Sequence, residues 1–351
     1  MGVRQANIAM AAMASSSAGQ SAAVGLDLMT VTRGAAICRI PERKSLRRLG
    51  SRIWYPQGMR GLPVKCIFVG LSLALLFGCP GAQPEPPDQR VYAPTARPHI
   101  GSLRLVSLNI AHGRNDALNQ VLLSKSAFAD NLRRIADLLI DMDAHVVALQ
   151  EADGPSRWSG GIDHVASLAE DAGYPWFERA SHAQSWLFDY GTALLSRQPF
   201  EEVLSYTFKP SPPTMNKGLL LAQIAWRSEN ETGKTHLVDI LSVHLDFSRQ
   251  KIREQQIEEM VKLLSERHHP SIVLGDFNSE WFSEASTVKA LAEEAGFQVY
   301  RPEANNLGTY KGGTKRLDWI LISKEFEFLD YRVSTDLVSD HHAVYAEIGL
   351  R

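Results

Sequence analysis

The segment 271–279 reads SIVLGDFNS, an apolar run that ends in Asp276 and Asn278. A run of about four to eight residues like this one is typical of a strand buried in a sheet. Asp276 and Asn278 are two residues apart, so on an extended chain both side chains point to one face, with Phe277 on the other. Such residues lie at a sheet edge, where binding and catalytic groups are common. The alternative is an Asx turn before the next helix.

The same pattern recurs along the chain, with polar residues placed where apolar runs end. Asn109 follows LRLVSL, Glu151 follows VVALQ, and His244 follows DILSV. Asp340 and His341 are adjacent near the C-terminus. One such residue could arise by chance. Five sets, all of types that bind metal ions or transfer protons, predict a common site at the ends of the strands.

Glu151 is a predicted metal ligand. A carboxylate at the end of a buried strand is costly unless a cation or hydrogen-bond donors satisfy it. Hard cations such as Mg²⁺ take oxygen ligands and are often held by only one or two carboxylates. The alternatives for Glu151 are a helix cap or a salt bridge in a loop.

The pair Asp340 and His341 resembles part of a nucleophilic triad with Ser339, but consecutive side chains diverge and cannot form one. We therefore predict Asp340 as a metal ligand and His341 as a proton-transfer group, which needs a carboxylate to fix its ring. Asp318 interrupts the apolar stretch RLDWI, where an unpaired charge is costly, and is the expected partner. His244 alone could be a hydrogen-bonded core histidine.

Alternating strand and helix patterns fill the rest of residues 101–351. We predict helices at 126–143, 249–267 and 284–295. The predicted strands are 103–110, 145–150, 191–196, 218–226, 235–245, 271–276, 316–323 and 343–348. The segments 154–190, 205–217 and 302–315 are expected to be rich in loops, and loops of that length commonly border a site.

The N-terminal part differs in composition. Residues 1–79 contain 10 Lys and Arg and 2 Asp and Glu, whereas residues 80–351 contain 27 and 37, a formal charge of −10. All three cysteines, Cys38, Cys66 and Cys79, lie in the first part. The rest of the chain therefore cannot form a disulfide.

Residues 59–79 read MRGLPVKCIFVGLSLALLFGC and have the layout of an export signal: a start residue, two positive charges and a short apolar stretch. The ending LFGC resembles the lipobox of bacterial lipoproteins, in which Cys79 is lipidated and becomes the mature N-terminus. The alternatives are a short signal anchor and a chance apolar run. Residues 1–58 are then expected to be a non-native or disordered extension, with translation starting at Met59. Residues 80–100 form a Pro-rich linker.

Taken together, these segments resemble the endonuclease/exonuclease/phosphatase superfamily. The matching motifs span 103–348 in the family's order: SLNIAHG (107–113), ALQEAD (148–153), GTALLSR (191–197), SVHLDF (242–247), LGDFNS (274–279), RLDWILIS (316–323) and SDHHAV (339–344). The resemblance implies an α/β (α+β) four-layer sandwich, in which two mainly antiparallel β-sheets pack face to face with helices on the outer faces. Two departures are Lys217-Gly218, where relatives often have Arg-Gly, and Thr192, where Asn is frequent.

The resemblance also implies Mg²⁺ or Mn²⁺ dependence and in-line attack of water on a phosphate ester. Glu151 is then the principal metal ligand, with Asn109 and Asp340 close by. Asp276 and Asn278 position water and phosphate. The remaining implied roles are those of His244 and His341, which bracket the phosphoryl group, and of Asp318, which orients His341. Which of Asp276 and His341 takes the proton stays open, and His112 could also reach the site.

Three functions are consistent with the sequence. The first is a phosphodiesterase or phosphatase acting on a lipid head group or small phosphate ester, attached to the membrane through lipidated Cys79 in the bacterial cell envelope. The second is an extracytoplasmic nuclease, which the acidic mature chain disfavours because tight duplex binding draws on many Lys and Arg contacts. The third is a non-catalytic binding lipoprotein, which the full set of site residues disfavours. We expect a monomer.

Overall fold

The computed structural model describes residues 87–92, 98–115, 117, 119–120, 123–229, 234–310 and 312–351. The predicted extension 1–58, the signal segment 59–79 and Cys79 lie outside the described residues. Two short strands, β1 and β2, lie within 80–100, where we expected only a linker. No helix in the described part of the chain is long and apolar enough to cross a membrane.

Two sheets face each other. Sheet A has the strand order β1-β7-β8-β9-β10-β12-β11, with β2 paired to β8, and sheet B has the order β13-β14-β3-β4-β6-β5. The strands of sheet A are β1 (Asp88–Val91), β2 (His99–Ile100), β7 (Glu202–Thr207), β8 (Gly218–Arg227), β9 (His236–His244), β10 (Ser271–Asp276), β11 (Gln298–Val299) and β12 (Asp318–Ile322). Those of sheet B are β3 (Leu103–Asn109), β4 (Val146–Gln150), β5 (Trp176–Gln184), β6 (Asp189–Ser196), β13 (Phe326–Val333) and β14 (Val344–Leu350).

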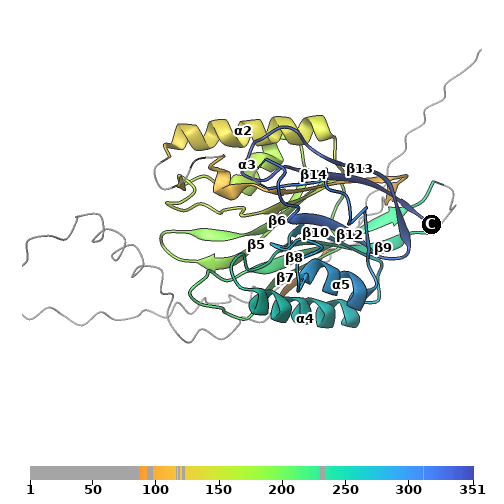
Figure 1. Cartoon of the computed structure of the whole chain (residues 1–351). Coiled ribbons are helices and arrows are strands. Elements are labelled where there is room, and N and C mark those ends of the chain that lie inside the picture. The colour runs from red at the N-terminus through yellow and green to blue at the C-terminus, as the bar shows by residue number, and fades with distance from the viewer. Residues whose placement is uncertain are drawn as a thin grey trace, which may run out of the picture. The chain divides into compact units, whose positions relative to one another are not determined.

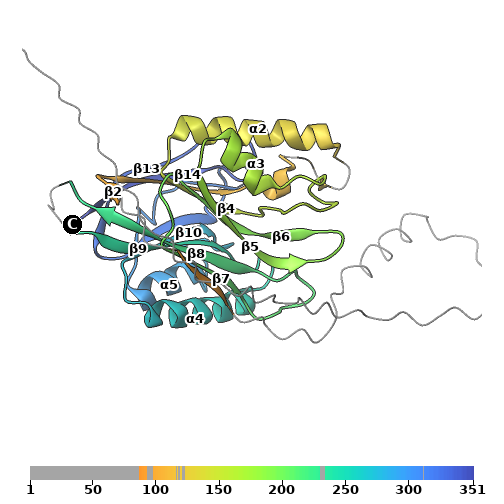
Figure 2. The same ribbon diagram turned by 180° about the vertical axis from the view of Figure 1, so that it is seen from behind.

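Helices cover the outer faces of both sheets (Figure 1). The helices α2 (Lys125–Met142) and α3 (His164–Asp171) lie on sheet B, and α4 (Gln250–Glu266) and α5 (Thr287–Ala295) lie on sheet A. The view from behind shows the same four layers (Figure 2). Most strand pairs are antiparallel, and the parallel ones are β9 with β10, β3 with β4 and β2 with β8. The predicted four-layer sandwich is confirmed.

Strand periodicity sorts the apolar side chains into the layers. On β3, Leu103 and Leu105 belong to the cluster between the sheets, whereas Val106 and Leu108 belong to the cluster under α2 and α3. Burying one such side chain contributes about 1.5–3 kcal/mol. Because side chains alternate, Asn109 shares the inter-sheet face with Leu103 and Leu105. A polar residue at the end of this strand therefore points between the sheets.

The segment 154–190, which we expected to be loop-rich, contains α3 and β5. The prediction was wrong there because α3 has only two turns and β5 (WFERASHAQ) has few apolar residues to show a pattern. Strands β7 and β13 were also missed. Both alternate only weakly, and their pairing with β8 and β14 decides their structure.

The strand register brings one end of both sheets together. In sheet A, Asp276 is opposite His244 on β9 and opposite Asp318 on β12, and His244 is opposite Gly218 on β8. In sheet B, Asn109 is opposite Gln150, the residue before Glu151. Because the candidate catalytic residues gather there, we call this edge the catalytic end of the sandwich.

A buried histidine joins the sheets near this end. His182 on β5 is 4% exposed, and its ring nitrogens lie 3.1 Å from Thr207 Oγ1 and 2.9 Å from Thr192 Oγ1. Gly218 permits this packing, since a Cβ there would lie 2.4 Å from the His182 ring. Burial, with repulsion from Lys217, lowers the pKa of His182 to about 3.

This lowered pKa predicts acid sensitivity. Between the folded pKa of about 3 and the unfolded pKa near 6.5, only the unfolded chain binds the extra proton, so stability falls as the pH drops through that window. Between pH 7 and pH 4.5, we expect the free energy of unfolding to fall by about 2–3 kcal/mol less in His182→Gln than in the unaltered protein. Urea unfolding at both pH values measures this difference. The control is His269→Gln at an exposed histidine, and equal losses in all three proteins would contradict the expectation.

Candidate active site

Asp276 lies at the centre of the catalytic end and is 1% exposed. Its Oδ2 accepts a hydrogen bond from Asn109 Nδ2 at 3.0 Å, so sheet B contacts sheet A at this carboxylate. Its Oδ1 accepts from the backbone N–H of Asn278 at 2.8 Å. Asn278, at φ 49°, donates its side-chain amide to Leu245 O at 3.1 Å. The Asx turn is therefore present and fixes the Asp276 carboxylate, whereas Asn278 lies beyond the end of the strand and not on the extended segment that we expected.

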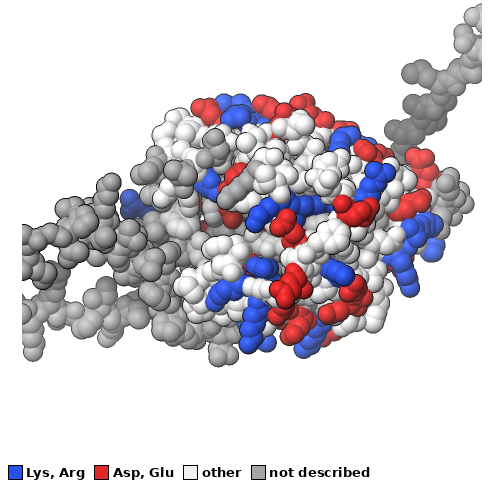
Figure 3. Space-filling view, in the orientation of Figure 1, with Lys and Arg blue, Asp and Glu red and all other residues white. Residues whose placement is uncertain are grey.

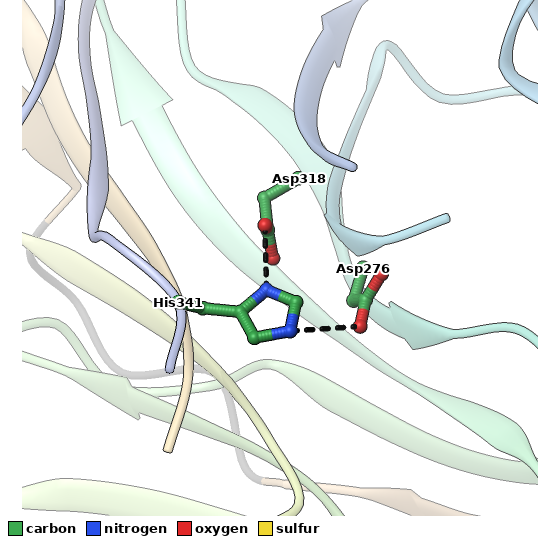
Figure 4. Close-up of side chains that lie close together, drawn as sticks. All are labelled: Asp276, Asp318 and His341. Carbon is green, nitrogen blue, oxygen red and sulfur yellow. Dashed lines mark hydrogen bonds and ion pairs between the residues drawn. The ribbon is translucent and has the colours of Figure 1, made fainter. Parts of the chain in front are cut away.

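His341 faces Asp276 across the site (Figure 4). Its Nε2 is 3.8 Å from Asp276 Oδ2, and its Nδ1 is 2.8 Å from Asp318 Oδ2. Thr309 Oγ1 donates to the same Asp318 oxygen at 2.6 Å and accepts from the backbone N–H of Asp318. The predicted pairing of Asp318 with His341 is present, with Thr309 as an additional donor.

Electrostatics favours a proton on His341. Burial opposes the charge, but Asp318 and Asp276 outweigh it and raise the pKa of His341 to about 10. For Asp276, burial and the charge of Asp318 raise the pKa to about 7, against the opposing effect of His341. The cluster therefore combines a protonated imidazole with a carboxyl group that can exchange a proton near neutral pH.

Glu151 lies on the sheet B side, just after β4, at φ 52°. Its Oε2 is 3.2 Å from His112 Nε2, and its Oε1 is 3.9 Å from His244 Nε2. His244 Nε2 is also 3.6 Å from Asp276 Oδ2, so His244 lies between the two carboxylates. Burial favours the neutral acid, but His112, His244 and Lys217 lower the pKa of Glu151 to about 2. Glu151 is thus ionised at neutral pH.

His112 is a member of this group. It is 8% exposed, and its Nδ1 is 3.0 Å from Oδ1 of Asp153, which is fully buried. The ring bridges Asp153 to Glu151 and holds the Glu151 carboxylate in place. The sequence had left open whether His112 reaches the site. It marked Asp153 only as the last residue of the motif ALQEAD.

Two further residues were missed. Lys217 and Tyr190 are buried beside His244: Lys217 Nζ donates to Tyr190 Oη and lies 3.2 Å from His244 Nε2, and Tyr190 Oη is 3.0 Å from His244 Nδ1. Burial lowers the pKa of Lys217, while Glu151 and Asp276 raise it in part. Burial, with Lys217, also holds the pKa of His244 well below its usual value. A lysine beside a neutral imidazole provides positive charge for an anionic ligand.

Asp340, the third predicted metal ligand, forms an ion pair with Arg114 in the structure. Its Oδ2 accepts from Arg114 Nη2 at 2.6 Å, and Arg114 also donates to Ala117 O. The adjacent Ser339 is buried and donates to Asn109 O at 2.7 Å, which attaches this loop to β3. The structure thus places Asp340 at the catalytic end, with Arg114 as its counter-ion.

Two groups of side chains could hold a metal ion. In the described residues, ligand atoms of Asp276, Asp318 and His341 lie within 4.8 Å of one another. In this group both oxygens of Asp276 and Oδ2 of Asp318 already accept hydrogen bonds, from Asn109, Asn278 and Thr309, and Oδ1 of Asp318 is the one carboxylate oxygen left without a partner among the described residues. The ionised carboxylate of Glu151 is 19% exposed and makes contact only with imidazole nitrogens at 3.2 Å and beyond. A hard cation prefers such a carboxylate oxygen, so the donor set at Glu151 fits one better.

Lys217 is expected to act on the ligand rather than on the fold alone. Replacing Lys217 with Met removes a buried donor aimed at the position of an anion, which is expected to lower kcat about 10²-fold. Lys217→Arg keeps the charge and is expected to retain most of the activity. Steady-state kinetics on the same substrate compare the three proteins. Equal losses for Met and Arg would show that packing, not charge, is what matters.

Comparisons with known proteins identify similar chains and similar folds. Residues 106–341 match the model of the Endonuclease/Exonuclease/phosphatase family. A family protein from Leptotrichia buccalis has 16% identity and a TM-score of 0.56, covering 71% of this chain and all of its own. None of the curated proteins compared with the chain matches it.

Two neighbours carry more specific names. The Bacteroides thetaiotaomicron mannosyl-6-phosphatase has 19% identity and a TM-score of 0.53, covering 71% of this chain and 100% of its own. The human Nocturnin catalytic domain has 16% identity and a TM-score of 0.52, covering 76% of this chain and 98% of its own. At these identities the likeness is one of fold.

Proposed function

The chain belongs to the endonuclease/exonuclease/phosphatase family, and from that premise we propose that it is a divalent-metal-dependent hydrolase of phosphate esters. One observation carries the proposal most directly. Nε2 of His244 and Nε2 of His341 lie 3.6 and 3.8 Å from the same oxygen of Asp276, with Glu151 on the far side of His244. This arrangement gathers two imidazoles and two carboxylates at one place, where they can stabilise the charge that develops as an anionic ester is cleaved.

Glu151 would hold the metal ion, with Asn109 and Asp340 nearby. When bound, a divalent cation supplies a Lewis acid that polarises a phosphoryl oxygen and stabilises negative charge on the leaving oxygen. Asp340 would leave Arg114 to join it. His112 keeps Glu151 oriented through its contact with Asp153. This kind of support commonly changes metal affinity about 10- to 100-fold.

The remaining residues act on water and on the phosphoryl group. We assign Asp276 as the base: Asn109 and Asn278 fix its carboxylate, and its raised pKa, about 7, suits proton transfer near neutral pH. Asp276 takes a proton as the water oxygen attacks phosphorus opposite the leaving oxygen. Protonated His341, oriented by Asp318, and Lys217, beside His244, donate to the non-bridging oxygens. As the new P–O bond forms, the P–O bond to the leaving oxygen breaks, and this oxygen takes up one proton, equal to the one that water gave to Asp276, and departs as the alcohol.

A lipid head group or another small phosphate ester is the proposed substrate. Residues 80–351 carry a formal charge of −10, and on the face in Figure 3 basic and acidic side chains are interspersed rather than gathered into a basic track. Duplex DNA binding without sequence preference relies on many basic contacts to phosphates. The neighbour named mannosyl-6-phosphatase illustrates a small phosphate ester as substrate on this fold.

The cell envelope is the proposed location, with attachment through a lipid on Cys79. The signal-like segment 59–79 supports it, and the chain from Pro80 onward has no further cysteine. Metabolic labelling with a radioactive fatty acid tests the attachment. The unaltered chain is expected to incorporate label and to fractionate with membranes, whereas Cys79→Ala should incorporate none. Equal labelling of both proteins would refute it.

A substrate panel tests the activity. Purified protein with Mg²⁺ or Mn²⁺ is incubated with phospholipid, sphingomyelin, bis-p-nitrophenyl phosphate, p-nitrophenyl phosphate and DNA. We expect turnover of a lipid or a small ester and loss of that activity with EDTA. Faster turnover of DNA than of any small ester would favour the nuclease. Activity of Glu151→Ala equal to that of the unaltered protein on every substrate would refute the mechanism.

A further inference from the structure

Exposed aromatic side chains gather at the catalytic end. Among the described residues, four large apolar side chains are more than 60% exposed: Val91 (75%), Trp186 (76%), Phe247 (65%) and Phe282 (75%). The three aromatic ones lie on loops that leave this end. Trp186 is at the tip of the β5–β6 hairpin, Phe247 is three residues after His244, and Phe282 is four residues after Asn278. Single exposed apolar residues are ordinary, but three on one rim are unusual.

Each of these aromatic residues lies in a tight turn that is closed by side-chain hydrogen bonds. Beside Trp186, Ser185 Oγ accepts from the backbone N–H groups of Leu187 and Phe188 at 3.1 and 3.3 Å. Beside Phe247, Asp246 Oδ1 accepts from the N–H groups of Ser248 and Arg249 at 2.9 and 2.8 Å.

The third turn is similar, since Ser283 donates to Glu280 O at 2.8 Å next to Phe282. The backbone that carries each exposed aromatic side chain is therefore held in place by a local turn. Little conformational entropy would be lost if these side chains were buried in a binding partner.

The first strand shows where the preceding chain joins the molecule. Asp88 is opposite Ser205, Ser205 is opposite Leu220, and Leu220 is opposite Ser242, two residues before His244. Moving from Asp88 to Val91 leads away from the catalytic end, because Val91 is opposite Glu202. The chain that precedes Asp88 therefore joins β1 on the side of the catalytic end. The C-terminus lies at the other end of the sandwich (Figure 1).

The distance to the proposed anchor is short. Eight residues separate Cys79 from Asp88. Nine peptide steps span at most ~30 Å when fully extended. A lipid on Cys79 would therefore keep the catalytic end, rather than the opposite end, close to the bilayer. The loops that carry the three exposed aromatics leave the sandwich at the same end.

We propose that Trp186, Phe247 and Phe282 form a docking rim that inserts into the surface of a lipid bilayer and presents the site to phosphate esters there. The substrate in this proposal rests on the proposed function. The docking surface rests on the exposure of the three residues and on the position of their loops. Aromatic rings are favoured at the level of lipid head groups. Lipid anchorage gains stability from such a second contact.

Charges on the rim select the kind of bilayer. The guanidinium of Arg157 lies 5.7 Å from the Trp186 ring, and Lys251 is exposed near Phe247. Two exposed acidic residues, Glu280 and Glu284, flank Phe282. Mixed signs match a zwitterionic surface, in which phosphate and amine charges alternate, better than an anionic one. The expected partner is therefore a phosphatidylethanolamine or phosphatidylcholine surface.

Site-specific labelling tests the rim. Because residues 80–351 contain no cysteine, Trp186→Cys, Phe247→Cys and Phe282→Cys each introduce one new thiol into the mature chain. Each is labelled with the fluorophore NBD, and the unaltered full chain is the blank. Leu329→Cys and Ile100→Cys are matched controls, because these apolar residues are 55% and 50% exposed and lie on strands far from the catalytic end.

Vesicles of phosphatidylcholine and phosphatidylethanolamine containing doxyl-labelled lipid provide the readout. We expect a blue shift and loss of NBD fluorescence at all three rim positions, and neither at the two controls. Rim quenching no greater than that of the controls would overturn the proposal. Quenching at the rim without turnover of any phospholipid would leave the docking surface standing and refute the lipid substrate. Turnover of a phospholipid without quenching at the rim would refute the docking surface and leave the lipid substrate standing.

Discussion

Glu151→Gln is expected to lower kcat/KM about 10³- to 10⁴-fold, because a metal-stabilised charge accounts for several kcal/mol of the barrier. Glutamine keeps the size of the side chain and one oxygen but removes the negative charge. In the structure, this is the carboxylate with the pKa lowered to about 2, next to three imidazoles and Lys217. Without it, the positive charge of Lys217 is no longer balanced and repels an incoming metal ion.

The loss should appear in metal binding as well as in rate. A titration with Mn²⁺, monitored by calorimetry or electron paramagnetic resonance, is expected to give a higher Kd for the variant. Glu259→Gln makes the same chemical change on α4, where Glu259 accepts from Tyr206 at 2.9 Å, far from this group. It should leave both readouts unchanged. Normal Mn²⁺ affinity in Glu151→Gln would show that the ion is held elsewhere, with the group Asp276, Asp318 and His341 as the next candidate.

Much of this site could be predicted from the sequence because its polar residues come directly at the ends of apolar strands. Asn109, His244 and Asp276 all end strands that run toward the same edge. Asp318 was recognisable because it begins an otherwise apolar strand. Each of these positions combines a local pattern with a chemical cost, which is what a single sequence can reveal.

Lys217 and Tyr190 could not be recognised by the same rule. Lys217 precedes β8, and Tyr190 is the second residue of β6, so both lie where strands begin. Because β8 is antiparallel to β9, with Gly218 opposite His244, the start of β8 meets the same edge as the end of β9. A rule that examined only strand ends missed them. Pairing direction is a tertiary property and was needed to find them.

The partner of Asp340 was unpredictable for a different reason. Arg114 is 226 positions away in sequence, at the end of a short 3-10 turn that nothing in the local pattern indicates. In that turn Ala111 and His112 have positive φ values of 46° and 55°, which non-glycine residues rarely adopt. The turn aims His112 at Glu151 and Arg114 at Asp340. Backbone strain of about 1–3 kcal/mol at such residues persists where the surrounding contacts fix it.

On each side of the site, one carboxylate holds a histidine toward a second carboxylate, but the pKa values of the two second carboxylates are shifted in opposite directions. On one side Asp318 holds His341 toward Asp276, and on the other Asp153 holds His112 toward Glu151. The pKa of Asp276 is raised and that of Glu151 is lowered, because more positive charge surrounds Glu151. Two carboxylates whose proton affinities are pushed apart are suited to different tasks. Glu151 can stay ionised for a cation while Asp276 exchanges a proton.

Asp276→Asn is therefore expected to lower kcat by about 10³-fold, within the range of general-base catalysis. The amide keeps the volume of the side chain, and Asn109 and Asn278 remain as neighbours. A raised pKa means that the base is lost as the pH falls, so kcat of the unaltered protein should decline below about pH 7, or lower with a cation bound, since a cation favours the charged carboxylate. In the variant this acidic decline should be absent.

Asp318→Asn is the matched control, because it removes the same charge from the same cluster but leaves the base. It should keep the acidic decline of the pH–rate profile. Its effect should appear at the basic side instead: His341 owes its raised pKa, about 10, first to Asp318, so activity should be lost at lower pH once that carboxylate is gone. Profiles of kcat from pH 5 to pH 10 for the three proteins separate the roles. An acidic decline that persists in Asp276→Asn and vanishes in Asp318→Asn would transfer the base from Asp276 to His341, whose ring Asp318 orients.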